Sequence, residues 1–144
     1  MKILLATDGS KFSDAATQSL AAQFRPQGTE VLVLSVIEPI SAVAPPQMSP
    51  RYYPELEDQI GEAKQLVERT AKTLANAGFK TSTSVATGEA KSVILDEAAE
   101  WDADLIVLGS HGRTGVERFL LGSVSEAVAR HTTCSVEIVR MPSS

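Results

Sequence analysis

The chain has 144 residues, 43% of them hydrophobic and 22% charged, and a formal net charge of −5. This size and composition predict one globular domain over residues 1–144, and the negative charge offers no general attraction for nucleic acid. A single cysteine, Cys134, excludes an intrachain disulfide framework. No apolar run approaches the roughly 18 residues of a membrane span or forms a secretory signal, so we expect a cytoplasmic protein that does not cross a membrane.

The first third of the sequence predicts two buried strands around a helix. The apolar run "KILLA" at Lys2–Ala6 is typical of a strand buried on both faces, and the turn "TDGS" at Thr7–Ser10 follows it. Apolar residues at every fourth position predict a helix over Ser13–Phe24. The run "EVLVLSVIE", Glu30–Glu38, indicates a second buried strand.

A proline-rich segment then interrupts the pattern. Pro39–Pro54 holds five prolines in sixteen residues and has no helical period. We expect an irregular excursion and not a domain boundary, since so short a segment cannot build a core of its own. Its position after the second strand leaves three roles open: a lid, a partner-binding segment, or a merely mobile loop.

Alternating strands and helices fill the rest of the chain. A long helix pattern with apolar residues at intervals of three and four ends at Gly78. The elements that follow are a strand at Lys80–Ala86, a helix at Ala90–Trp101, a strand at Ala103–Leu108, a helix opening at Ser123 and a strand at Ser135–Arg140. This order predicts an α/β fold with a parallel sheet and helices on both faces.

The stretch "GSHGRTGVERFLLGS", Gly109–Ser123, joins the fourth strand to the last helix with four glycines. Glycine permits positive φ and lets backbone N–H groups approach a ligand, and a helix N-terminus attracts anions. A phosphate site is one interpretation; a mobile loop with a Ser123–Glu126 capping box is the other. Within the loop, His111 has no carboxylate neighbour in the sequence, so we expect it to be exposed.

Asp8 follows the first strand and admits two interpretations. Its carboxylate is suited to accept a hydrogen bond from an adenine amino group or a ribose hydroxyl. It is equally suited to an Asx turn within "TDGS". The residues alone leave both open.

The spacing Gly109-x-x-Gly112, nine residues, Gly122-Ser123 resembles the G-2x-G-9x-G-[ST] pattern of ATP-binding universal stress proteins. The segments "ILLATDGS" and "VLVLSVIE" and the sequence from Ala103 to Arg140 also resemble that family. The resemblance implies a Rossmann-like open sheet of five strands in the order 3-2-1-4-5, with about four helices. It also implies a stress-response regulatory protein with ATP in the crevice beside strands one and four.

Carried over by position, the resemblance implies three groups of ATP-binding residues. The adenine and ribose side would comprise Ala6, Thr7, Asp8 and Val36. The ribose and first phosphate would lie beside Leu108 and Gly109. The phosphates would meet Gly112, Arg113, Gly122, Ser123, Val124 and Ser125.

The resemblance further implies Mg²⁺ or Mn²⁺ with the triphosphate, and a homodimer through the last strand, Ser135–Arg140. Glu137 stands where the family usually has an apolar residue, which puts the usual dimer geometry in doubt. We identify no catalytic residue and no metal ligand in the chain.

Three functions follow from these expectations. The first is a regulatory ATP-binding protein with at most slow hydrolysis, because no convincing general base is apparent. The second is an ATPase or phosphotransferase, and the third a binder of AMP or cAMP in the same pocket. For the first, we expect Gly109→Val and Gly122→Val to abolish binding while leaving the fold largely intact.

Overall fold

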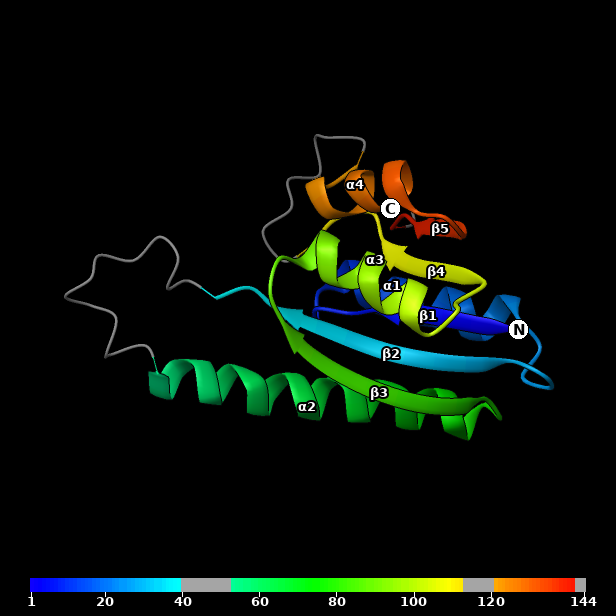
Figure 1. Cartoon of the computed structure of the whole chain (residues 1–144). Coiled ribbons are helices and arrows are strands. Elements are labelled where there is room, and N and C mark those ends of the chain that lie inside the picture. The colour runs from blue at the N-terminus through cyan, green and yellow to red at the C-terminus, as the bar shows by residue number, and fades with distance from the viewer. Residues whose placement is uncertain (40–52, 113–120, 142–144) are drawn as a thin grey trace.

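The computed structural model describes residues 1–39, 53–112 and 121–141. Strands and helices alternate in the predicted order (Figure 1). They are β1 Lys2–Ala6, α1 Lys11–Gln23, β2 Glu30–Ile37, α2 Tyr53–Asn76, β3 Lys80–Thr87, α3 Ala90–Glu100, β4 Leu105–Gly109, α4 Ser123–His131 and β5 Ser135–Val139. None of the helices in the described ranges is long and apolar enough to cross a membrane.

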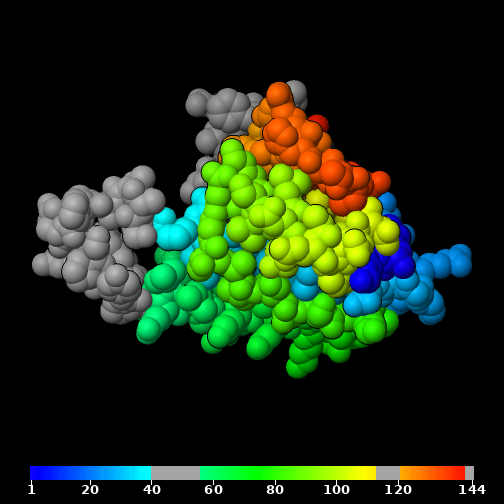
Figure 2. Space-filling model, in the orientation of Figure 1, coloured from blue at the N-terminus to red at the C-terminus, as the bar shows by residue number. Residues whose placement is uncertain are grey.

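The five strands form one parallel sheet in the order β3-β2-β1-β4-β5. The expected fold class and strand order are therefore confirmed. Helices α1 and α2 pack on one face, and α3 and α4 pack on the other, where they cover the sheet in the space-filling view (Figure 2). The neighbouring strands β1 and β4 are followed by helices on opposite faces of the sheet, α1 and α4. The chain therefore leaves the carboxyl ends of these two strands in opposite directions.

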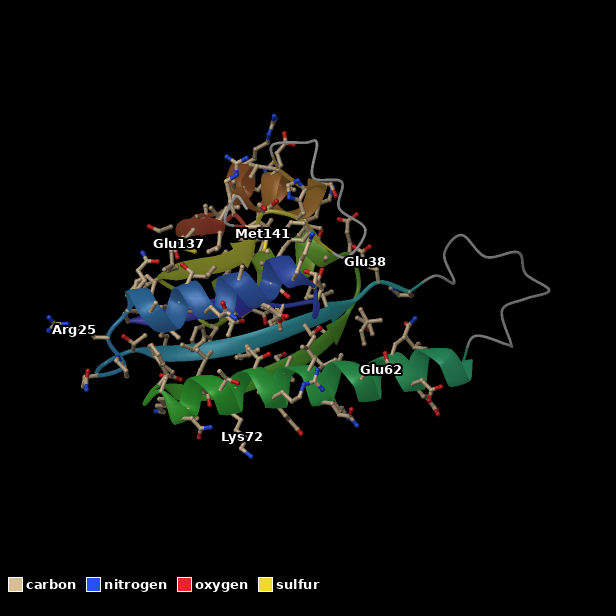
Figure 3. All side chains as sticks on the ribbon, turned by 180° about the vertical axis from the view of Figure 1, so that it is seen from behind. Arg25, Glu38, Glu62, Lys72, Glu137 and Met141 are labelled. Atoms are coloured by element: carbon tan, nitrogen blue, oxygen red, sulfur yellow. The ribbon has the colours of Figure 1, made fainter. Side chains whose placement is uncertain are left out.

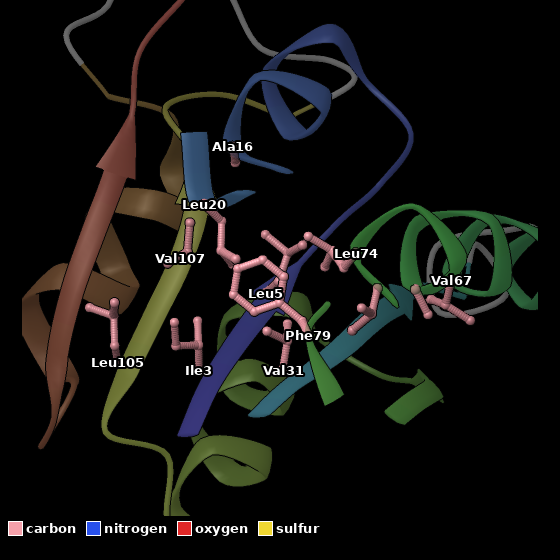
Figure 4. Packing of buried hydrophobic residues seen from close by; sticks show 12 residues of the cluster. Ile3, Leu5, Ala16, Leu20, Val31, Val67, Leu74, Phe79, Leu105 and Val107 are labelled. Atoms are coloured by element: carbon pink, nitrogen blue, oxygen red, sulfur yellow. The ribbon is translucent and has the colours of Figure 1, made fainter. Parts of the chain in front are cut away.

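The core consists of two apolar layers separated by the sheet. Successive residues of the central strand β1 alternate between them: Ile3 and Leu5 face α1 and α2, whereas Leu4 faces α3 and α4. Figure 4 shows the first layer, in which Leu20 of α1 and Leu74 of α2 converge on β1. Ile3, Leu4 and Leu5, the three central residues of β1, are fully buried, as the continuous apolar run predicts.

Two helices begin earlier than the sequence pattern predicts. α1 begins at Lys11, because the Ser10 side chain caps it by accepting the Ser13 N–H at 3.2 Å. α2 begins at Tyr53, so Pro54 belongs to its first turn, where a missing N–H costs no helical bond. The rest of the expected proline-rich excursion, residues 40–52, lies outside the described residues.

Gly109 is a packing residue. A Cβ built on it would lie 2.7 Å from the backbone carbon and oxygen of Phe12, so glycine is required where α1 crosses the end of β4. Positive φ is not the reason, since Gly109 is absent from the glycines with that conformation among the described residues. The expectation that Gly109→Val leaves the fold largely intact stays a prediction, and this contact counts against it because α1 or β4 has to shift.

We predict that Gly109→Ala lowers the free energy of unfolding by about 1–3 kcal/mol, because α1 has to move away from β4. Gly61→Ala is the matched control: Gly61 lies within α2, and a Cβ there meets nothing within 4 Å. That control should gain up to about 1 kcal/mol from helix propensity. Urea denaturation measures both, and equal stability of Gly109→Ala and the native protein would contradict the packing role.

Candidate functional site

A cavity of about 340 Å³ opens at the carboxyl ends of the strands, beside β1 and β4. Ligands of open α/β sheets bind at this position, where the chain turns to opposite sides of the sheet. The cavity is lined by Ala6, Thr7, Asp8, Ser13, Leu34, Val36, Ala90, Ile94, Leu108, Gly109, His111, Gly112, Leu121, Gly122, Ser123, Val124 and Ser125.

Every expected site residue lines this cavity except Arg113, which lies outside the described residues. The lining residues that sequence reasoning missed are Ser13, Leu34, Ala90, Ile94, His111 and Leu121. Periodicity provides a signal for some of them. Leu34 precedes Val36 by two positions on the same strand face, and Ile94 lies one helical turn after Ala90.

One wall of the cavity is apolar. Leu34 and Val36 come from β2, Ala90 and Ile94 from α3, and all four line the same pocket. Leu34 and Ile94 also belong to the core layer beneath α3. This wall therefore offers dispersion contacts to a flat apolar group but few hydrogen bonds.

The opposite wall carries hydroxyls from the end of β1 and the start of α1. Thr7 Oγ1 donates to Ser13 Oγ at 3.1 Å, and Ser13 Oγ donates to the Ser10 carbonyl oxygen at 3.0 Å. Thr7 and Ser13 are both buried. Since these bonds satisfy the two buried hydroxyls, they fix the first turn of α1 against β1.

Asp8 forms the expected turn and still faces the cavity. Its Oδ1 accepts the Ser10 N–H at 2.9 Å, which is an Asx turn. Its Oδ2 points at Gly112, where an added Cβ would lie 3.0 Å from that oxygen. The turn is thus confirmed, and the role of Asp8 toward a ligand stays a prediction that the position of Oδ2 allows.

The start of α4 is attached to the end of β4 through one carbonyl group. The Ser110 carbonyl oxygen accepts the Gly122 N–H at 2.6 Å and the Ser125 hydroxyl at 2.8 Å. Ser125 Oγ also lies 3.1 Å from the Gly122 carbonyl oxygen. Close packing favours glycine at position 122, because a Cβ there would lie 3.1 Å from His111 Cα and 3.2 Å from the Ser110 carbonyl oxygen. The valine variant therefore also strains the loop itself.

The expected capping box is absent. The N-cap of α4 is Gly122, with φ −74° and ψ 164°, and no side chain caps the helix. Ser123 is the first helical residue and is exposed. The N–H groups of Ser123, Val124 and Ser125 precede the first intrahelical bond, Glu126 N–H to the Gly122 carbonyl, so the helix itself gives them no acceptor.

His111 is buried, contrary to the expectation of an exposed loop residue. It is 9% exposed, and its ring packs against Phe12 with centroids 5.1 Å apart. Its Nδ1 lies 3.0 Å from Ser110 Oγ. His111, two residues after the end of β4, lies against Phe12 of α1, a contact that neighbours in the sequence cannot reveal.

Three helix N-termini contribute residues to the cavity, and they differ in capping. Ser10 caps α1. At α3 the Ala90 N–H donates to Glu38 Oε1 at 2.8 Å. Among these three helices, only at the start of α4 does no side-chain oxygen accept a backbone N–H. An anion in the cavity therefore meets available N–H groups and positive dipole at α4.

Within the described ranges, no three His, Cys, Asp or Glu side chains are grouped so that they can hold a metal ion.

We predict that Ser125→Ala lowers stability by about 1 kcal/mol, because the Ser110 carbonyl loses a buried donor. Hydrogen exchange at the first turn of α4 should accelerate. Ser123→Ala is the matched control and should change neither quantity appreciably, since that hydroxyl makes no cap. Equal destabilisation by the two variants would indicate that the capping box forms after all.

The sequence matches the universal stress protein family over residues 1–140. Universal stress protein Sll1388 of Synechocystis is 32% identical over 151 residues, which cover 96% of this chain and 97% of the relative. The solved structure of hypothetical protein MJ0577 superposes with a TM-score of 0.85 at 30% identity and covers 99% of this chain and 97% of that one. UspA from Lactobacillus plantarum gives 0.86 at 26% identity, with 97% of each chain covered.

Two further solved structures share the fold and contain nucleotides. One is a universal stress protein in complex with cAMP, at 21% identity and a TM-score of 0.67 over 96% of both chains. The other is a family protein from Arabidopsis thaliana with AMP bound, at 18% identity and 0.69 over 99% of this chain and 92% of that one. On its sequence match and its architecture, this chain belongs to the universal stress protein family.

Proposed function

We propose that the chain is a regulatory protein of the stress response that binds ATP in the cavity, with the triphosphate at the start of α4. The observation that carries this proposal is the glycine N-cap: the cavity contains a helix start whose N–H groups have no side-chain acceptor. Phosphate oxygens are the acceptors that such a group of amides favours. The cavity volume lies within the range of small-molecule sites, roughly 300–1,000 Å³.

The cavity walls also suit the adenine and the ribose, the two remaining parts of the nucleotide. Adenine packs against the apolar surface of Val36, Ala90 and Ile94. The sugar hydroxyls or the adenine amino group donate to Asp8, whose carboxylate accepts but cannot donate. Gly112 leaves room beside Asp8 Oδ2, since even a methyl group there would crowd that oxygen.

In this proposal Mg²⁺ or Mn²⁺ arrives with the triphosphate. The metal neutralises phosphate charge and takes its ligands mainly from phosphate and water, as Mg²⁺ commonly does. The described residues suit that arrangement, because they offer amide donors for phosphate and no grouped metal ligands.

Retention of the nucleotide, with slow hydrolysis at most, is the regulatory mode we propose. The titratable side chains named in the described wall are Asp8 and His111, and each is already engaged: Asp8 Oδ1 in its turn, His111 Nδ1 near Ser110. A general base has to lie within hydrogen-bond reach of the proton it removes, directly or through one water. Turnover of about 1 s⁻¹ or faster, the low end of kinase rates, would favour the enzyme alternative.

The family structures with AMP and cAMP support a second candidate, a monophosphate ligand in the same cavity. Small molecules released from the purified, denatured protein and identified by mass spectrometry separate the candidates. We expect ATP, whereas AMP or cAMP would establish the alternative. Competition calorimetry with all three nucleotides ranks their affinities independently of what the host cell supplies.

We also propose that the chain forms a homodimer through β5. Within the described residues, β5 pairs only with β4, so its other edge presents backbone N–H and C=O groups to a partner. Sedimentation of the intact chain tests this part separately from nucleotide binding.

Asp8 provides the sharpest binding test. We predict that Asp8→Ala weakens ATP and adenosine by roughly tenfold to a hundredfold, the effect of one lost buried hydrogen bond. Inorganic tripolyphosphate should bind as before, because the start of α4 is unchanged. Asp8→Asn retains an oxygen for the Ser10 turn and thus isolates the ligand role. If calorimetry shows tripolyphosphate weakened as strongly as adenosine, Asp8 acts through loop geometry instead.

A further inference from the structure

Glu137 occupies the centre of the edge strand β5 and has a buried oxygen without a partner. The strand runs Ser135–Val139, and Glu137 is half-buried within it. Its Oε2 is the one buried side-chain oxygen or nitrogen of the described residues that lacks a hydrogen bond. Figure 3 shows Glu137 on β5 at the rim of the sheet. A carboxylate in this position costs free energy that a cation or a proton would relieve.

The register of β5 assigns its side chains to two faces. Glu137 pairs with Val107, which belongs to the core layer under α1 and α2, so Glu137 points to that face. Val136 and Ile138 pack against the other layer, under α3 and α4. Each apolar residue of that pair is only half-buried, so the strand retains apolar surface for a partner.

Symmetry limits what a second copy can place opposite Glu137. Two β5 edges related by a two-fold axis run antiparallel, and the axis stands perpendicular to the sheet, so each face of one copy continues as the same face of the other. Directly opposed side chains lie on one face. Within β5, Glu137 can therefore oppose only Ser135, Glu137 or Val139 of the second copy, none of which is a cation.

Strand length selects one of these registers. Pairing centred on Glu137 matches all five residues of β5 with all five of the copy. Val136 then opposes Ile138 twice on the α3 face, while the two Glu137 side chains oppose each other on the α1 face. Shifting the centre to Val136 or Ile138 leaves an end of each strand unpaired and loses backbone bonds.

We propose that β5 pairs with β5 of a second copy in the register centred on Glu137, and that the two facing carboxylates hold this self-association weak. The inference rests on the homodimer proposed above and adds its register and its strength. Apolar contacts on one face favour the pair, and like charges directly opposite on the other face disfavour it. Removing either negative charge strengthens the dimer.

The first test compares Glu137→Gln with the native chain by analytical ultracentrifugation. The neutral variant has nearly the same shape and should lower the dimer dissociation constant several-fold, up to about fivefold for one relieved cross-strand pair. Glu100→Gln is the control, because Glu100 is exposed on α3, away from β5, and its variant should associate like the native chain. Unchanged or weaker association of Glu137→Gln would overturn the proposal.

The second test is a charge exchange. Glu137→Lys mixed with the native chain places opposite charges at the centre of the register, so native mass spectrometry should show the mixed dimer in excess of both homodimers. Statistical mixing, or no dimer, would overturn the register. If the lysine variant fails to fold, the glutamine comparison still decides. Nucleotide affinity of Glu137→Gln, measured in parallel, should equal that of the native chain, so failure of the dimer and failure of the ATP site are distinguishable.

Discussion

The carbonyl oxygen of Ser110 holds the start of α4 against the end of β4, and the cavity depends on that attachment. Gly122 N–H and the Ser125 hydroxyl both reach this one acceptor. The Ser110 N–H in turn donates to the Val139 carbonyl at 2.9 Å, so the same residue also joins the end of β5. Ser110 is almost fully buried, and its bonds therefore form in a low-dielectric setting where they are difficult to replace.

Gly109, Gly112 and Gly122 have separate roles around this attachment. Gly109 lets α1 cross β4, Gly122 lets the start of α4 reach Ser110, and Gly112 leaves space beside Asp8. Only the last of these tasks concerns room for a ligand directly. What distinguishes α4 from α1 and α3 is that no side-chain oxygen accepts from its first N–H groups, whereas Ser10 accepts at α1 and Glu38 at α3. The position of α4 beside the end of β4 and the available N–H groups of its first turn together form the site that we propose for phosphate.

The sequence predicts the architecture well because its strongest signals are local. The continuous apolar runs at Lys2–Ala6 and at Ala103–Leu108 produce central strands that are buried on both faces, and the alternation of elements leads to a parallel sheet. The strand order came from the family resemblance, and the structure has the same order. The spacing of Gly109, Gly112 and Gly122 likewise pointed to residues that the fold brings to one cavity.

Contacts between distant segments were not predictable in the same way. The burial of His111 depends on Phe12, which is about a hundred residues earlier in the chain. The cap of α3 depends on Glu38, and the tight packing of Gly109 depends on α1. The capping box predicted at Ser123 is wrong for a related reason. The Ser110 carbonyl accepts the Gly122 N–H, Gly122 is the N-cap, and Ser123 is the first residue inside the helix.

The central claim is that the first amides of α4 receive the phosphates of an adenine nucleotide. Backbone amide chemical shifts of Ser123, Val124 and Ser125, followed by NMR during separate titrations with ATP and with adenosine, test it most directly. The account predicts large shifts of these three amides with ATP and small ones with adenosine, while residues of the apolar wall respond to both. Saturation with ATP that leaves the three amides unmoved would contradict it.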